Sequence, residues 1–202
     1  QIILILFHKL KIFLFKKKLL KTNHQLLLGN INKDTIYGEY GCGQSTLYVL
    51  KNFNIPILSV DSSKNWVKKV KINNKNNNLM LNYIDIGFTE YKHSWGRPVD
   101  YSKRKNFIDY ANDIWRRKLK PNLVLIDGRL RVLCFLVSLK RCNNGTKIIF
   151  DDYVERKYYH VVEELIKPTN KNKKQCLFIV DKKKIDIKKL NFLINKFNYV
   201  LD

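Results

Sequence analysis

The sequence predicts a doubly wound α/β domain, in which a mostly parallel, seven-stranded sheet lies between two layers of helices. From Thr35 onward, short continuous apolar runs alternate with segments of helical periodicity, which is typical of parallel strands buried on both faces. The chain has 202 residues and is 45% hydrophobic, which is enough for one core. We therefore expect a basic helical segment over residues 1–32 and one domain over residues 33–202.

Strands and helices are expected to alternate along this domain. The apolar runs predict strands at residues 35–40, 55–61, 79–86, 121–128, 146–153, 175–181 and 198–202. The helical patterns cover residues 45–52, 62–72, 107–119, 129–142, 154–166 and 188–197. Residues 87–106 show no sustained period and predict a long loop, which is usually functional or disordered.

Acidic side chains end four successive strands of the predicted sheet. Asp61 ends the second strand, Asp85 the third, Asp127 the fourth, and Asp151 and Asp152 the fifth. A single aspartate at such a place is commonly a helix cap. In open α/β sheets, however, ligands bind beyond the carboxyl ends of the strands. Because four strands in a row end in this way, the sequence predicts a ligand site at this edge.

The first strand leads into a helix through two glycines, Gly41 and Gly43, in the stretch "GEYGCGQST". Two glycines alone say little, because many tight turns use one. With Asp61 eighteen residues after Gly43, the stretch resembles the first two motifs of class I S-adenosylmethionine (SAM)-dependent methyltransferases. The resemblance implies the Rossmann-like methyltransferase fold, SAM as the cofactor and methyl transfer as the activity.

The resemblance also implies which residues bind the cofactor. They are Glu39, Gly41, Cys42, Gly43, Ser45, Asp61, Ser62 and Asp85. Glu39 is expected to meet the amino group of the methionine part, Asp61 the ribose hydroxyls, and Asp85 the adenine amine. The glycines are expected to let the backbone approach the ligand closely.

A dinucleotide-binding oxidoreductase is the alternative reading of the glycines. Its pattern, G-x-G-x-x-G, would place a third glycine where this chain has Thr46, and it does not require Glu39. The methyltransferase pattern places a small residue at position 45, where Ser45 replaces the frequent glycine. The segments "LIDGRLRV" and "FDDYVERKYYHVVEEL" further resemble an uncharacterised methyltransferase-like group, and the resemblance covers residues 33–182.

The catalytic candidates are groups that can take a proton from the methyl acceptor. We expect Asp127, Asp152 and His160 in this role, with His93 as a further candidate in the loop.

Acceptor contacts are expected from Trp95 and Arg97 in the loop and from Arg129 after the fourth strand. Tyr91, Pro98 and Tyr101 lie near the loop residues in the sequence. An aromatic and cationic loop of this kind fits an acceptor lid, and it equally fits a loop fixed by a buried tryptophan.

A metal site is an open alternative at the same edge. Asp127, Asp151 and Asp152 resemble the carboxylates that hold Mg²⁺ in catechol-type O-methyltransferases, and Mg²⁺ prefers oxygen ligands. Arg129 and Arg131, which follow Asp127 directly, instead favour ion pairs and an anionic acceptor. We therefore expect no metal.

The charge leaves the acceptor open. The formal net charge is +22, from 39 Lys and Arg against 17 Asp and Glu, which favours a polyanionic partner such as nucleic acid. The lysines are, however, spread along the chain together with many Asn and Ile, as A/T-rich coding would produce. We expect a small-molecule acceptor, with an RNA methyltransferase or a non-catalytic binding protein as alternatives. The segment after the fourth strand, "IDGR", lacks the N/D-P-P-aromatic motif of amine-methylating nucleic-acid enzymes.

The first 20 residues are apolar runs interrupted by basic residues such as Lys9, Lys11 and Lys16. The interruptions come too early for a membrane span of about 20 residues. The segment fits a helix that covers an edge of the sheet, or a basic amphipathic helix on a membrane surface. The chain begins at Gln1 without an initiator Met, as a fragment would. The four cysteines form no CxxC pair, and we expect free thiols in a reducing cytosol, which predicts a cytoplasmic protein.

Overall fold

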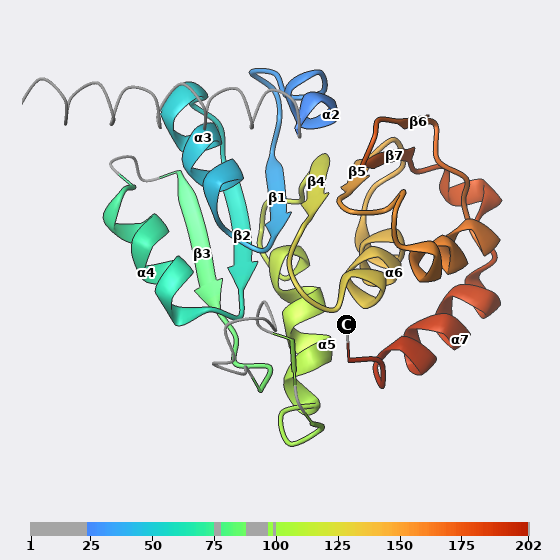
Figure 1. The fold of residues 1–202 in the computed structure, drawn as a ribbon. Helices are drawn as coiled ribbons and strands as arrows, with labels where there is room; N and C mark the ends of the chain where they lie inside the picture. Colours follow the sequence, from blue (N-terminus) through green and yellow to red (C-terminus); the bar gives the residue numbers. More distant parts are fainter. Residues whose placement is uncertain (1–23, 75–77, 88–96, 99, 202) are drawn as a thin grey trace, which may run out of the picture.

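The computed structural model describes residues 24–74, 78–87, 97–98 and 100–201. Within them, seven strands form one sheet with helices on both faces (Figure 1), which confirms the predicted doubly wound fold. The strands are β1 (Tyr37–Tyr40), β2 (Ile57–Asp61), β3 (Leu79–Tyr83), β4 (Leu123–Ile126), β5 (Lys147–Phe150), β6 (Asn170–Lys171) and β7 (Cys176–Ile179). They are arranged in the order β3-β2-β1-β4-β5-β7-β6.

The sheet is parallel from β3 to β5, and its last two strands form an antiparallel hairpin. In β1, Glu39 lies between Ser59 of β2 and Leu125 of β4. β7 runs antiparallel to β5, with Cys176 opposite Phe150. The sheet is therefore mostly parallel, as predicted.

The seventh strand is not where we expected it. We expected it at residues 198–202, but the described part of that segment, residues 198–201, forms no strand. The short strand β6 takes the edge position instead, because residues 170–177 turn back on themselves and pair Asn170 with Leu177. The segment at 198–201 contacts the end of the long loop.

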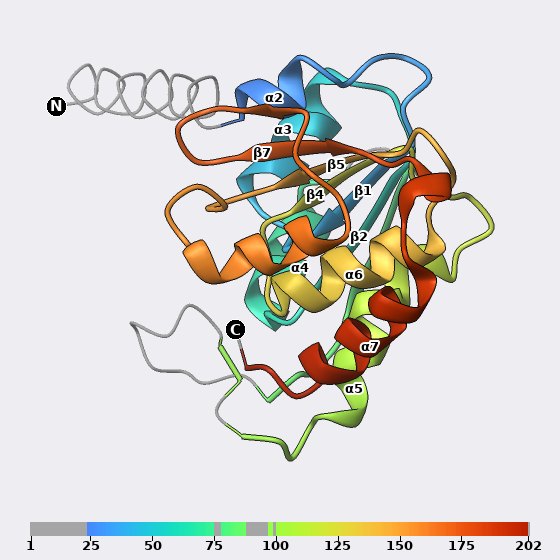
Figure 2. The same cartoon turned by 90° about the vertical axis from the view of Figure 1, so that its right-hand side faces the viewer.

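Helices on the two faces of the sheet bury two separate cores (Figure 2). One face is covered by α2 (Gln25–Leu28), α3 (Gln44–Asn52) and α4 (Lys64–Ile72). The other elements are α5 (Lys105–Asn112), η1 (Asp113–Trp115), α6 (Arg131–Arg141), η2 (Lys157–Glu164), η3 (Lys182–Lys184) and α7 (Ile187–Phe197). Among the described residues, no helix combines the length and the apolar character that crossing a membrane requires.

Two predicted helices differ in detail. The helix expected over residues 107–119 ends at Trp115, whose indole N–H donates to the buried Tyr40 hydroxyl at 2.9 Å. The helix expected over residues 154–166 is the shorter 3₁₀ segment η2. Its Tyr159 ring lies against the Phe150 ring, with 4.7 Å between centroids, so η2 still covers the sheet next to β5.

Candidate functional site

The loops after β1 and β4 meet at the carboxyl edge of the sheet. β1 and β4 are neighbours, and the following strands continue from them in opposite directions across the sheet. Such a topological switch point is where open α/β sheets bind ligands. The structure therefore brings together the glycine turn and the segment around Asp127, as the sequence predicts.

The two glycines of the turn have different roles. Gly41 has a φ of +90°, and a Cβ added to it would lie 2.5 Å from the Cα of Gly128 in the β4–α6 loop. Gly41 is thus required for the contact between the two loops. Gly43 has extended backbone, and a Cβ built on it would meet nothing within 4 Å. Of the two, Gly43 is the one with open space for a ligand.

Glu39 is fully buried beneath this turn. Its carboxylate accepts hydrogen bonds from the Tyr37 hydroxyl at 3.0 Å and from the hydroxyls of Ser45 and Thr46. Thr46 also accepts the Gly43 N–H at 2.8 Å. Burial raises the pKa of Glu39 to about 7, although the hydroxyl donors lower it. Glu39 therefore fastens the turn to α3, and its expected contact with the amino group of SAM stays a prediction.

Asp61 lies at the end of β2, beside the turn. It is 7% exposed and accepts the Ser63 N–H at 2.6 Å. Burial raises the pKa of Asp61 to about 6, against hydrogen bonds from Ser63 and Cys42 that lower it. Cys42 and Ser62 are buried next to it, and burial raises the pKa of the Cys42 thiol. The structure thus joins the glycine turn to Asp61, as the motif spacing predicts.

Asp85 follows β3 and is more open. Its carboxylate accepts the Gly87 N–H at 3.0 Å and lies 3.7 Å from the Lys103 ammonium group, with 40% of the side chain exposed. Its backbone carbonyl accepts the Asn106 side-chain amide at 2.6 Å. Asp85 therefore keeps a partly exposed carboxylate at the same edge of the sheet.

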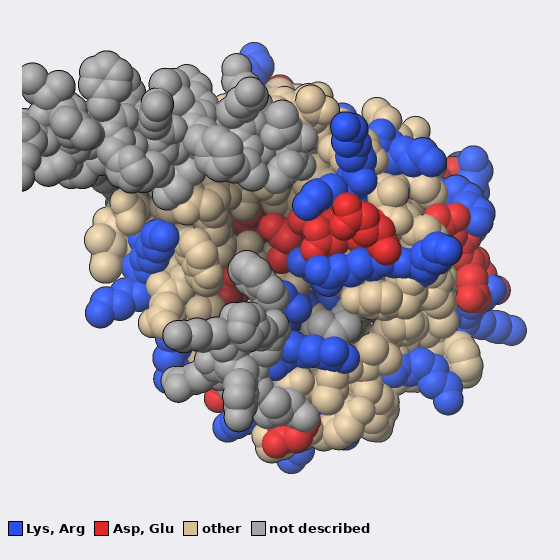
Figure 3. Space-filling model, in the orientation of Figure 1, with Lys and Arg blue, Asp and Glu red and all other residues tan. Residues whose placement is uncertain are grey.

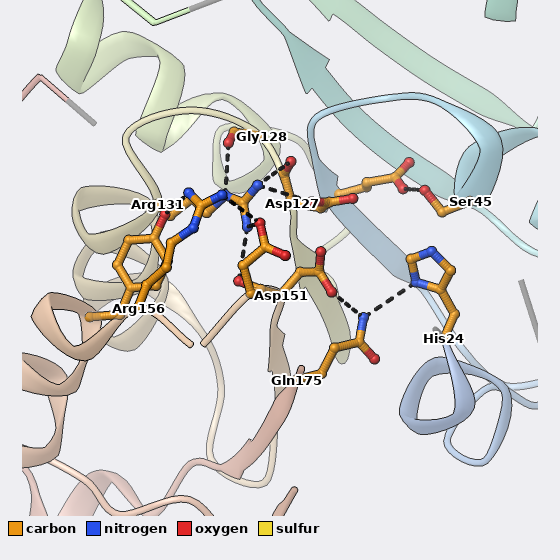
Figure 4. A network of polar contacts seen from close by, with 11 residues as sticks. His24, Ser45, Asp127, Gly128, Arg131, Asp151, Arg156 and Gln175 are labelled. Carbon is orange, nitrogen blue, oxygen red and sulfur yellow. Dashed lines mark hydrogen bonds and ion pairs between the residues drawn. The ribbon is translucent and has the colours of Figure 1, made fainter. Parts of the chain in front are cut away.

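A buried arginine joins the loops after β4 and β5 (Figure 4). Arg131 is 4% exposed, and its guanidinium pairs with Asp127 and with Asp152, each at 3.1 Å. It also donates to the carbonyls of Gly128 at 3.0 Å and Asp151 at 2.8 Å. The ion pair with Asp127 agrees with the sequence prediction, but the link to the loop after β5 was not predicted.

Asp127 combines partial exposure with several charged neighbours. Its side chain is 31% exposed. The pKa of Asp127 is raised well above its usual range, first by burial and then by Asp151, while Arg131 opposes the shift. In the view of Figure 3, Asp and Glu side chains gather near the middle of the face and are bordered by Lys and Arg.

Two residues that the sequence analysis missed complete this network (Figure 4). The side-chain amide of the fully buried Gln175 donates to Asp151 at 2.6 Å, and it lies 3.3 Å from Nδ1 of His24. Burial lowers the pKa of His24, and Asp151 opposes this shift. No sequence signal marks either residue, because both reach the site only through the direction of β7 and the position of α2.

Backbone strain is concentrated next to Arg131. Among the described residues, Leu130 and Asp152 are the only non-glycine residues with positive φ, at 52° and 56°. This conformation costs an L-residue roughly 1–2 kcal/mol. Strained residues persist where the surrounding structure fixes them, often at functional sites. Here both lie within the loops that Arg131 joins.

The catalytic candidates are not all brought together. Asp152 accepts from both Arg131 and Arg156, the second at 2.8 Å, so its carboxylate is engaged. The His160 ring stacks on the Tyr153 ring with 4.7 Å between centroids, and its Nε2 lies 3.1 Å from the Tyr153 carbonyl oxygen. Of the three candidates, Asp127 is the one that borders the glycine turn.

The described end of the long loop is attached to the C-terminal segment. Arg97 donates to the Leu201 carbonyl at 2.7 Å, and the Tyr101 hydroxyl donates to the Tyr199 carbonyl at 2.9 Å. The Arg104 guanidinium lies 4.4 Å from the centroid of the Tyr199 ring.

Other predicted residues in this region are placed less fully. Pro98 is buried, and Arg129, two residues after Asp127, is half-buried. Tyr91, His93 and Trp95 lie outside the described residues. The predicted acceptor contacts in the loop therefore stay predictions.

The three aspartates proposed as alternative metal ligands have other partners. Asp127 and Asp152 face Arg131, and Asp151 accepts from Gln175. Within the described ranges, no group of three or more His, Cys, Asp or Glu side chains is placed to hold a metal ion. The donor set therefore suits ion pairs better than Mg²⁺.

The fold is similar to the crystal structure of a methyltransferase-like protein from Silicibacter pomeroyi. The two share 28% sequence identity with a TM-score of 0.69, over 82% of this chain and 89% of that chain. The chain belongs to the class I methyltransferase-like superfamily. The resemblance predicted from the glycine turn and Asp61 is confirmed.

Other methyltransferases share this methyltransferase-like fold at low sequence identity. A TehB-like SAM-dependent methyltransferase from Corynebacterium glutamicum has a TM-score of 0.51 and 9% identity over 86% of this chain and 98% of that chain. A methyltransferase from Pyrococcus furiosus has a TM-score of 0.50 and 12% identity over 85% and 98%. No protein-family model and no curated protein matches the sequence.

Proposed function

We propose that the protein is a SAM-dependent methyltransferase acting on a small-molecule acceptor. The observation that carries the proposal is the junction at the switch point. There, Gly43 faces open space, Asp61 closes β2 beside it, and Asp127 lies across the contact between Gly41 and Gly128. This places a candidate cofactor-binding turn next to a candidate base in a methyltransferase-like fold.

The residues at the turn fit the cofactor. Among the described residues, a Cβ at Gly43 would meet no atom within 4 Å, which leaves space there for a ligand. The carboxylate of Asp61 suits the two hydroxyls of a ribose, and Asp85 offers a partly exposed carboxylate for an amine. When bound, SAM supplies an activated methyl group on a sulfonium. Gly43, Asp61 and Asp85 would hold it, while Glu39 keeps the turn in place from below.

Asp127 is the proposed general base. The acceptor must lose a proton as it is methylated, and a positioned carboxylate with a raised pKa can accept it. Asp127 is partly exposed, its pKa is raised, and Arg131 fixes its position. Asp152 and His160 are less suited, because Asp152 binds two arginines and His160 stacks on Tyr153. We propose acceptor contacts from Arg129, which is half-buried and follows Asp127 by two residues.

The same ion pairs support a second candidate, a protein that binds SAM without transferring its methyl group. Arg131 forms ion pairs with both Asp127 and Asp152, so these two carboxylates also have a purely structural role. Such a protein would keep the cofactor site at Gly43 and Asp61 but would not need Asp127.

Calorimetry with SAM and S-adenosylhomocysteine, with and without Mg²⁺, tests the cofactor site. We expect the wild-type protein to bind both, Asp61→Asn to bind weakly, and Asp127→Asn to bind as the wild type does. Absence of binding to the folded wild-type protein would contradict both candidates. Transfer of labelled methyl to pooled small molecules then separates them, since an enzyme loses transfer in Asp127→Asn while keeping its SAM affinity.

A further inference from the structure

Helix α4 carries a basic and aromatic face that the proposed reaction does not use. Its inner side is apolar, with Val67 and Val70 buried in the core between α3 and the sheet. Its outer side, here named the α4 basic face, consists of Lys64, Trp66, Lys68, Lys69 and Lys71, all of them exposed. The Trp66 side chain is 37% exposed. Lys and Arg side chains stand out at the left of Figure 3, over α4.

The positive charge of the α4 basic face is not compensated within the protein. Residues 62–74 contain no Asp or Glu. In the described part of the chain, none of the four lysines forms an ion pair. Lys64 lies in the first turn of the helix, where the helix dipole disfavours a cation. Lys64 and Lys68 are one turn apart, so their charges repel. Bound anions would relieve both effects.

Aromatic rings lie among these charges. The Lys69 ammonium group is 4.3 Å from the centroid of the Trp66 ring, and that of Lys64 is 5.2 Å from the centroid of the Tyr83 ring at the end of β3. Cations interleaved with exposed aromatic rings are the combination with which proteins bind unpaired nucleotides, because phosphates meet the charges and bases stack on the rings.

We propose that the α4 basic face binds single-stranded nucleic acid, with the lysines on phosphates and a base on Trp66. A duplex would not offer an unpaired base to Trp66. A membrane surface fits less well, because the apolar side of α4 is already buried in the core and only Trp66 and Ile72 remain as exposed apolar side chains for lipid. The face begins directly after Asp61, Ser62 and Ser63, so a bound strand would lie next to the proposed cofactor site. The proposal does not depend on methyl transfer.

Binding of an oligouridylate of about 12 nucleotides to the full chain tests the proposal by fluorescence anisotropy. We expect Lys68→Glu/Lys69→Glu to weaken binding about tenfold or more and to reduce its dependence on salt. We expect Trp66→Ala to weaken binding by about five- to a hundredfold and to leave the salt dependence unchanged, since stacking carries no charge. The matched control is Lys183→Glu/Lys188→Glu, which makes the same charge change at exposed positions on η3 and α7, away from α4. It should change the affinity by about twofold or less.

Three outcomes would overturn the proposal. One is no binding of the oligonucleotide at about 50 mM salt. Another is equal weakening in the α4 and control double variants, which would indicate binding by diffuse net charge. The third is that the α4 lysines are needed for binding to phosphatidylserine vesicles but not for binding to the oligonucleotide. Melting curves confirm that the variants fold. SAM calorimetry on the same samples tests the proposed function independently, so that a failure of the nucleic-acid proposal can be told apart from a failure of the proposed function.

Discussion

Gly41 and Gly128 face each other at the ends of β1 and β4, so closely that a Cβ on Gly41 would lie 2.5 Å from the Cα of Gly128. The glycine turn, which in this motif usually allows a ligand to approach the backbone, here also forms a contact between two loops. The contact brings Asp127 to the glycine turn and so defines the candidate site. We therefore expect fold stability and cofactor binding to depend on different glycines of the same motif.

Gly41→Ala is expected to lower the free energy of unfolding by about 2–4 kcal/mol, because it combines a left-handed backbone with a steric clash. Gly43→Ala should change stability by about 1 kcal/mol or less, because its backbone is extended and its Cβ would meet nothing. It should nevertheless weaken SAM binding. Urea unfolding and calorimetry on both variants measure the two effects, and an unstable Gly43→Ala with a stable Gly41→Ala would refute the assignment.

Glu39 should make stability depend on pH. Its pKa rises on folding from 4.5 to about 7, so its stabilising contribution is complete below pH 4.5 and is lost as the pH rises to about 7. The loss is on the order of 3 kcal/mol. Asp61 contributes in the same direction, but only up to about pH 6.

Glu39→Gln should therefore remove most of the decrease in unfolding free energy between pH 6 and 8. Denaturant unfolding at several pH values measures this, with Glu155→Gln at an exposed position as the control. A slope in Glu39→Gln equal to that of the wild type would show that Glu39 does not titrate in this range.

Arg131 and Arg156 both bind Asp152, but they should differ in their effect on stability. Replacing the buried Arg131 by Met leaves Asp127 and Asp152 without their shared partner, which should cost about 3–5 kcal/mol. Replacing Arg156 by Met should cost about 1 kcal/mol or less, because its side chain is 38% exposed. Thermal or urea unfolding of the two variants gives the comparison, and similar losses would speak against a central role for Arg131.

SAM binding should weaken as the pH falls below about 6. Asp61 has a pKa of about 6, and its protonated form is a poorer acceptor for ribose hydroxyls than the carboxylate. In Asp61→Asn the affinity should be low at every pH, without this dependence. Asp34→Asn, at an exposed position before the amino end of β1, serves as the control. An affinity that is flat in the wild type between pH 5 and 8 would exclude Asp61 from the ribose contact.

The fold and the position of the site could be predicted because they follow from local patterns. Continuous apolar strands, the turn at Gly41 and Gly43, and the acids that end the second to the fifth strand all depend on residues close in sequence. The direction in which a side chain points is not determined by residues close in sequence alone. Glu39 stands where the motif predicts, yet it points into the protein, because Tyr37, Ser45 and Thr46 offer it three hydroxyl donors.

The rest of the site depends on contacts between distant segments. Nothing in the sequence around Gln175 shows that the strand after it runs antiparallel, and so its contact with Asp151 could not be predicted. Arg131 was expected to pair with Asp127. Its contact with Asp152 was not expected, because it depends on the left-handed backbone of Asp152, which a residue other than glycine rarely adopts.

The reversed direction of β7 has a consequence for how this edge of the sheet can vary. Because Cys176 pairs with Phe150, the chain leaves the edge at Asp151 and returns to it at Gln175. Residues 152–174 therefore form a segment whose two ends lie together at this edge of the sheet. Insertions or deletions within residues 165–169, which join η2 to β6, would therefore reshape the surroundings of the site without moving the strands. This segment is the natural one to exchange when the acceptor preference of such a protein is to be redesigned.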